Sequence, residues 1–213
     1  TKKLCENIQT SNKKISIVFA SSIQAEIDNP YGKSKKNAEE ILINLNKKHG
    51  VNVYIFRLPN VFGKWSKPNY NSVVATFCYN ISRELPIQIN DKSKMLKLVY
   101  IDDVIQKFIE LILNSDVKVE KKYFVNIEPI YNITLADLAK QIKSFKNIEN
   151  SGILENVGTG LIRALYSTYI SFLPKEKFSY PLLSKKDSRG NFVEILKKQN
   201  SGQFSFFTAL PGI

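Results

Sequence analysis

The 213-residue sequence lacks the glycine-rich segment with which nucleotide-binding α/β proteins hold a pyrophosphate. Its nine glycines are scattered, and no G-x-G-x-x-G or G-x-x-G-x-x-G spacing occurs. That segment joins the first strand of such a fold to its first helix, where the backbone approaches the phosphates closely. The sequence also begins without methionine. We therefore expect a partial chain whose pyrophosphate cradle would lie before Thr1.

Cysteine and histidine are scarce, which argues against a disulfide framework and against a metal centre within this chain. Cys5 and Cys78 are the only cysteines and form no C-x-x-C pair, so a reducing cytoplasm suits the protein. The single histidine, His49, stands among lysines near the expected end of a helix, where a cation interacts favourably with the helix dipole. We expect no metal ligand among these residues.

Long apolar runs and clustered charge are also missing. No apolar run approaches the roughly 20 residues that span a bilayer, so we expect no membrane segment. The net charge of +12 suits anionic ligands such as a UDP-sugar and a dinucleotide, although a general bias toward lysine would produce it equally well. Because the lysines are spread out and no nucleic-acid-binding motif occurs, we expect no nucleic-acid partner.

The first 60 residues show the pattern of a strand, a helix and a second strand. The apolar run 15–20 predicts a buried strand that ends at Ser21 and Ser22. A turn follows, and Asp28 or Asn29 caps a helix. The apolar face of this helix contains Ala38, Ile41, Leu42 and Leu45. A second apolar run, 51–58, completes the crossover unit of a parallel sheet.

Tyr31 and Lys35 are four residues apart at the start of this helix, so they lie on the same helix face. An ammonium there favours the ionised phenol, which suits a proton donor or acceptor. Ser22 would hold the same carbonyl oxygen. A helix rich in tyrosine and lysine also produces this spacing by chance, but the strand that ends in two serines favours a catalytic group.

The second strand closes in Arg57-Leu58-Pro59-Asn60-Val61-Phe62-Gly63. With Ser22, Tyr31 and Lys35, this segment makes the chain resemble the extended short-chain dehydrogenase/reductase family, which carries Tyr-x-x-x-Lys and Arg-x-x-Asn-Val-Phe/Tyr-Gly. Segments 65–77 and 165–169 resemble one branch of it, the bifunctional reductase/epimerases of capsular polysaccharide biosynthesis in the UDP-L-fucosamine pathway. In that branch a cupin domain follows the reductase, and the resemblance covers essentially the whole chain.

The resemblance implies roles for individual residues. Tyr31 would be the catalytic acid, Lys35 its cationic partner and a ribose ligand, and Ser22 the second donor to the substrate carbonyl, with Ser21 as its backup. Pro59, Asn60 and Val61 would lie beside the nicotinamide. The implied substrate-binding residues are Asn60, Lys64, Lys67, Asn69, Tyr70, Asn71 and Lys97. The alternative interpretation of the loop 64–71 is an ordinary solvated turn.

Two pairs of residues need comment, because the first departs from the family pattern and the second carries carboxylates close to it in the sequence. Many relatives have an Arg-Asp pair where this chain has Leu96-Lys97, and a lysine binds phosphate as a point charge without the fork of arginine. Asp102 and Asp103 precede an apolar helical pattern, so we expect them to be helix caps and not catalytic acids.

The implied fold class is α/β. It comprises a partial Rossmann-like, doubly wound parallel sheet, a mixed substrate-binding portion and the opening strands of a β cupin domain. Residues 1–60 would be the C-terminal part of the nucleotide-binding sheet, without its glycine-rich first half, 61–180 the substrate-binding portion, and 181–213 a truncated cupin start. The patterns predict helices near 73–83, 104–113 and 135–145, the last capped by Thr134, a linker over 147–160 and a strand over 203–208.

The implied function of the intact protein is NADPH-dependent reduction of the C4 keto group of a UDP-4-keto-6-deoxy-N-acetylhexosamine. The resemblance also implies NADP(H) in preference to NAD, C3 epimerisation by the cupin, zinc only in the absent remainder of that cupin, and a cytoplasmic homo-oligomer. A sugar-nucleotide 4-epimerase and an inactive fragment that acts in assembly remain alternatives. Dehydratase chemistry is disfavoured because Ile23-Gln24 stand where the 4,6-dehydratases carry an Asp-Glu pair.

Overall fold

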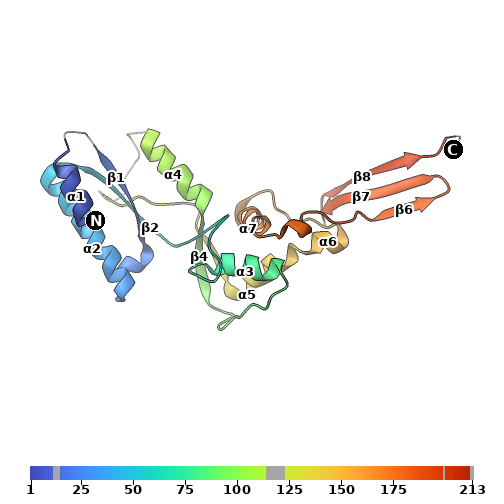
Figure 1. The fold of residues 1–213 in the computed structure, drawn as a ribbon, viewed down its shortest axis with the longest axis horizontal. Helices are drawn as coiled ribbons and strands as arrows, with labels where there is room; N and C mark the ends of the chain where they lie inside the picture. The colour runs from blue at the N-terminus through green and yellow to red at the C-terminus, as the bar shows by residue number, and fades with distance from the viewer. Residues whose placement is uncertain (12–14, 114–122, 199, 212–213) are drawn as a thin grey trace. The chain divides into compact units, whose positions relative to one another are not determined.

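The computed structural model describes residues 1–11, 15–113, 123–198 and 200–211 (Figure 1). The chain forms two compact units. The first consists of Thr1–Val61 and Lys97–Ile130, and the second of Phe62–Leu96 and Tyr131–Ile213. The predicted catalytic residues Ser22, Tyr31 and Lys35 belong to the first unit, whereas the predicted substrate-binding loop 64–71 belongs to the second. The division into three functional blocks stays a prediction.

The first unit is built on the predicted crossover. Strands β1 and β2 pair in parallel, in a register that runs from Ser16 opposite Asn52 to Ser22 opposite Leu58. Helices α1 and α2 cover one face of this pair and α4 covers the other (Figure 1). The elements are α1 (Lys2–Gln9), β1 (Ser16–Ser22), the 3-10 helix η1 (Ile23–Glu26), α2 (Pro30–His49), β2 (Asn52–Leu58) and α4 (Ile101–Leu113).

Helix α2 begins and ends at the residues that local chemistry favours. The Asn29 side chain caps it and accepts a hydrogen bond from the Gly32 N–H at 2.7 Å, so Asn29 is the cap of the two candidates. Pro30 occupies the first turn, where its missing N–H costs nothing. Gly50, with φ of 68°, ends the helix directly after His49.

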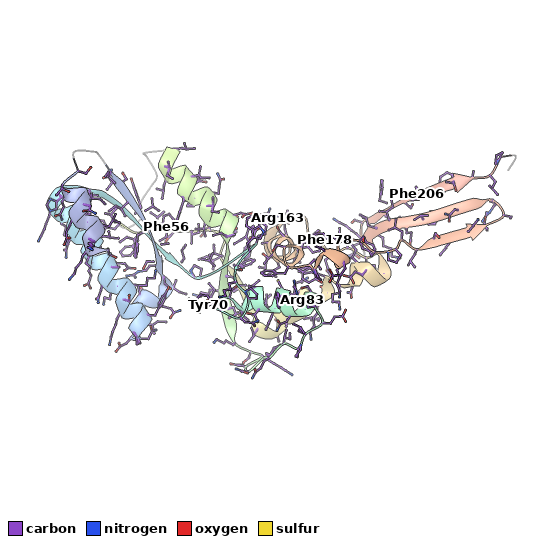
Figure 2. All side chains as sticks on the ribbon, in the orientation of Figure 1. Phe56, Tyr70, Arg83, Arg163, Phe178 and Phe206 are labelled. Carbon is purple, nitrogen blue, oxygen red and sulfur yellow. The ribbon has the colours of Figure 1, made fainter. Side chains whose placement is uncertain are left out.

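Successive side chains of β2 point to opposite faces of the sheet, so the core of the first unit has two layers. Val53 and Ile55 pack with buried side chains of α1 and α2. Phe56, which is labelled in Figure 2, and Leu58 pack on the opposite face. The centre of the Phe56 ring lies 4.8 Å from that of the Phe108 ring in α4. The predicted parallel pairing is confirmed, and the chain is an α/β protein. Strand β2 is largely buried, whereas β1 is only partly buried, because Ser16 and Ala20 are exposed.

The second unit contains helices and two pieces of sheet. Helices α3 (Val73–Ser82), α5 (Leu135–Ser144) and α7 (Gly160–Ile170) pack together around apolar side chains. The Ser72 and Thr134 side chains cap α3 and α5, as Thr134 was predicted to do. The shorter elements are α6 (Asn147–Ser151) and the 3-10 helix η2 (Lys175–Lys177). Strands β3 (Asn60–Phe62), β4 (Met95–Tyr100) and β5 (Tyr131–Thr134) form a sheet in the order β3-β4-β5. Residues 60, 61 and 97–100 of this sheet belong to the first unit and the others to the second.

The C-terminal segment forms a three-stranded antiparallel sheet of β6 (Ser184–Asp187), β7 (Gly190–Lys198) and β8 (Gly202–Ala209) (Figure 1). The strand predicted over 203–208 is therefore confirmed. Large apolar side chains remain exposed on β8, among them Phe204, Phe206 and Phe207. The assignment of residues 181–213 to the start of a cupin domain stays a prediction.

Two local predictions are wrong. The segment 147–160, predicted to be a linker, begins with α6 and then pairs with β7, where the Leu154 N–H donates to the Lys197 carbonyl at 2.8 Å. Asp102 and Asp103 are not caps, because α4 begins at Ile101 directly after β4 and both carboxylates lie in its first turn. They still interact favourably with the helix dipole there.

Candidate functional site

Ser22 is the last residue of β1 and caps η1. Its Oγ accepts a hydrogen bond from the Gln24 N–H at 3.2 Å. This bond uses an acceptor lone pair of the hydroxyl and leaves its proton available for donation. Ser22 is thus a buried hydroxyl, fixed at the carboxyl end of a parallel strand, that can donate to a ligand oxygen.

Tyr31 is the second residue of α2, and its side chain is 51% exposed. The next residue, Gly32, is buried, and a Cβ placed there would collide with the carbonyl oxygens of Gln24 and Ile27. The absence of a side chain therefore allows the first turn of α2 to dock against η1. This contact places the first turn of α2, which carries Tyr31, beside the turn that follows Ser22.

The ammonium of Lys35 lies between the end of β1 and the phenol ring. Its Nζ donates to the Ala20 carbonyl at 3.1 Å. It also lies 5.7 Å from the centre of the Tyr31 ring and 5.4 Å from that of Phe19. A cation over an aromatic face is attracted by the ring, so these contacts hold the ammonium close to the Tyr31 side chain.

A buried carboxylate, Glu39, lies one helical turn beyond Lys35 on the same face of α2 and is only 2% exposed. The Ser21 hydroxyl donates to Glu39 Oε1 at 2.5 Å, and Arg57 Nη2 donates to Glu39 Oε2 at 2.7 Å. Arg57 also binds Glu26 at 2.5 Å. The hydrogen bond to Glu39 is the largest cause that raises the pKa of Arg57 above its ordinary value. We call Ser21, Glu26, Glu39 and Arg57 the Glu39 network.

The Glu39 network joins β1, η1, α2 and β2, one turn along α2 from Lys35. Ser21 was predicted to be a backup for Ser22, but the structure uses its hydroxyl to bind Glu39. Successive strand residues point to opposite faces, so Ser21 and Ser22 face different sides of β1. The sequence analysis did not single out Glu39, although the four-residue spacing from Tyr31 through Lys35 to Glu39 is a signal that could have identified it.

The predicted nicotinamide residues follow β2 at the same edge of the sheet. Ser22 is the register partner of Leu58, and Pro59, Asn60 and Val61 come directly after it. The Asn60 side chain donates to the Lys97 carbonyl at 3.0 Å, which places exposed Lys97 beside this edge. Ligands of parallel α/β sheets bind at the carboxyl ends of the strands. The first unit therefore brings Ser22 and residues 59–61 to one edge of the sheet.

The other predicted substrate residues, Lys64, Lys67, Asn69, Tyr70 and Asn71, lie in the loop between β3 and α3, in the second unit. The Ser66 hydroxyl donates to the Gly63 carbonyl at 2.9 Å, and the Asn69 N–H donates to Thr76 Oγ1 at 2.9 Å. The loop is thus anchored at both of its ends.

Neither a cluster of metal-ligating side chains nor a helix that could cross a membrane occurs within the described residues. His49 is exposed at the end of α2, the position that the sequence predicted.

The chain is 53% identical, over all 213 residues, to a UDP-2-acetamido-2,6-beta-L-arabino-hexul-4-ose reductase of Pseudomonas aeruginosa, and it spans 56% of the length of that protein. The crystal structure of the capsular polysaccharide assembling protein CapF from Staphylococcus aureus is similar with a TM-score of 0.92 and 39% identity, over 100% of this chain and 57% of that one. The Bordetella bronchiseptica enzyme WbmF, in complex with NAD⁺, shares the fold at 16% identity and a TM-score of 0.64, over 80% of this chain and 62% of that one.

A family model agrees with these likenesses. The model of the NAD dependent epimerase/dehydratase family matches residues 3–133, which is more than half of the chain. The resemblance recognised in the sequence is therefore confirmed, and the chain belongs to the NAD dependent epimerase/dehydratase family.

Proposed function

We propose that the protein reduces the C4 keto group of a UDP-4-keto-6-deoxy-N-acetylhexosamine in surface polysaccharide biosynthesis, with NADPH as the reductant. One observation carries this proposal: the Lys35 ammonium is held against both the Tyr31 ring and the end of β1. The reductase name of the Pseudomonas relative supports the substrate class.

In this proposal the residues of the first unit handle the substrate oxygen and its proton. Ser22 donates its hydroxyl proton in a hydrogen bond to the keto oxygen and polarises the carbonyl. Tyr31 then transfers its phenolic proton to that oxygen as the alcohol forms, and the Lys35 ammonium stabilises the phenolate left behind.

The residues present fit a nicotinamide cofactor. Lys35 has three N–H donors, and its bond to Ala20 leaves others for ribose hydroxyls. Pro59, Asn60 and Val61 lie at the strand ends where such a ring would bind, beside Ser22. When bound, the reduced nicotinamide supplies the hydride that C4 accepts. The preference for NADP over NAD is part of the proposal and rests on the family resemblance.

The proposal keeps the substrate-binding residues that the family resemblance implies. Asn60 and Lys97 belong to the first unit, and the loop between β3 and α3 supplies the remaining side chains. Lysines suit the diphosphate, because an ammonium binds phosphate as a point charge. These remaining residues are Lys64, Lys67, Asn69, Tyr70 and Asn71.

The sheet of β6, β7 and β8 would open a cupin domain that epimerises C3 in the whole protein, with zinc bound by residues outside this chain. Its exposed phenylalanines support this assignment, because such side chains are normally covered in a completed β domain. The proposal also includes a homo-oligomer in the cytoplasm.

Replacement of Tyr31 by phenylalanine tests the proposal in the intact protein. We expect Tyr31→Phe to lower kcat for NADPH-dependent reduction of the 4-keto sugar by at least about 100-fold, because the proton donor is lost. Tyr180→Phe, in the second unit, is the matched control and should keep the wild-type rate. Unchanged reduction by Tyr31→Phe would show that this assignment is wrong. Interconversion of C4 epimers without net NADPH consumption would favour the 4-epimerase instead.

A further inference from the structure

Trp65 stands out among the large apolar side chains of the described residues, because it is 86% exposed. It is the only tryptophan of the chain. Burial of an aromatic ring contributes more to stability than that of most side chains, so leaving this one in water forgoes a large stabilisation. The sequence analysis did not assign a role to it.

The backbone holds Trp65 in an unfavourable conformation. Its φ is 64°, and Asn69 in the same loop has a φ of 54°. A left-handed conformation is uncommon for residues other than glycine, and for a bulky side chain it persists only where surrounding contacts impose it. The bonds from Ser66 to Gly63 and from Asn69 to Thr76 are contacts of this kind. Hydrogen bonds on residues close to Trp65 thus hold the backbone of the loop that carries it.

The surroundings of Trp65 are cationic and aromatic. Lys64 and Lys67 flank it, and no acidic residue occurs from Gly63 to Arg83. The Lys67 ammonium lies 5.6 Å from the centre of the Tyr70 ring, whose residue is 72% exposed and is labelled in Figure 2. A flat ring next to cations matches a nucleotide, since bases stack on aromatic faces and phosphates bind ammonium groups.

We propose that Trp65 is the stacking platform for the nucleobase of a nucleoside-diphosphate ligand, with Lys67 on the side of its diphosphate. This inference rests on the proposed function for the identity of the ligand, a UDP-sugar. It adds a residue that contributes binding energy and takes no part in the chemistry. A protein surface that covers Trp65 is the competing explanation.

Fluorescence of Trp65 provides the first test. The intact protein is titrated with UDP, with uridine and with pyrophosphate, and the emission of Trp65→Phe is subtracted to isolate this side chain. We expect UDP and uridine to change the emission and pyrophosphate to leave it unchanged, because only the base reaches the ring. Unchanged emission in saturating UDP would overturn the inference.

Kinetics provide the second test. Trp65→Ala should raise KM for the UDP-sugar by about tenfold or more with kcat almost unchanged, and Trp65→Phe should raise it less, since phenylalanine still stacks. Phe178→Ala removes another exposed ring of the second unit and should leave KM unchanged. A wild-type KM for Trp65→Ala, in a protein that still reduces the sugar, would refute the stacking role and leave the proposed function intact. Wild-type protein that shows the UDP-dependent emission change but reduces no 4-keto sugar would refute the proposed function alone.

Discussion

Two carboxylates, one in each unit, hold several elements together in opposite environments. Glu39 in the first unit is 2% exposed and binds Ser21 and Arg57. Glu84 follows α3 in the second unit, its side chain is 65% exposed, and it binds Lys146 at 3.1 Å and Lys177 at 2.8 Å. Both residues connect three segments of the chain, so the main difference between them is their access to water.

The comparison shows that the distances within an ion pair do not by themselves determine how much the pair contributes to the free energy of unfolding. A buried charge whose partner is removed has no water to replace it, whereas an exposed charge is resolvated at little cost. Hydrogen bonds from Lys177 and then Lys146 lower the pKa of Glu84 to about 2. Even so, removal of the Glu39 carboxylate should lower the free energy of unfolding far more than removal of the Glu84 carboxylate.

The largest effect is expected for Glu39→Ala. This change leaves the Arg57 guanidinium without its main partner, so we expect a loss of about 3 to 5 kcal/mol in the free energy of unfolding. Urea denaturation followed by circular dichroism measures it. Glu40→Ala, at an exposed position of the same helix, is the matched control and should change the midpoint little. A loss for Glu39→Ala as small as that of this control would remove the contrast between the two carboxylates.

A smaller effect is expected for Ser21→Ala. This change removes one donor to Glu39 and leaves the arginine in place, so the free energy of unfolding should fall by about 1 kcal/mol. Ser34→Ala, at an exposed position of α2, serves as the control in the same urea experiment. If the two variants were equally stable, the Ser21 hydroxyl would not be part of the stabilising network.

The smallest effect is expected for Glu84→Gln, whose urea midpoint at neutral pH should lie close to that of the wild type. Because the folded pKa is below the ordinary value of 4.5, the charged carboxylate stabilises the fold above about pH 4.5, and this stabilisation is lost as the pH falls toward 2. The small difference between the wild type and Glu84→Gln should therefore shrink over this window in pH-dependent melting curves. A difference that grows on acidification would reverse the sign assigned to Glu84.

Local signals account for the parts of the fold that the sequence predicted. The apolar runs that became β1 and β2 are short and end at polar residues, and Asn29 and Thr134 carry the side chains that cap helices. The positions of Tyr31 and Lys35 on one helix face followed from their spacing. These predictions depended on neighbours in the sequence and not on tertiary contacts.

The failed linker prediction and the missed role of Glu39 both depended on tertiary contacts. Glu39 looks like a solvated helix residue until Arg57, 18 positions later, is seen to bind it. The polar segment after Asn147 looks like a linker because its pairing with Lys197 is long-range. Trp65 was overlooked because its exposure and its positive φ are not visible in the sequence.

The contact of Gly32 with η1 also bears on how this chain can evolve. Any side chain at this position would meet two carbonyl oxygens and push the first turn of α2, with Tyr31, away from η1. Every substitution of Gly32 should therefore impair the protein, whereas the exposed positions Lys33 and Ser34 should tolerate substitution. In a saturation library selected for activity, glycine should be the sole survivor at this position.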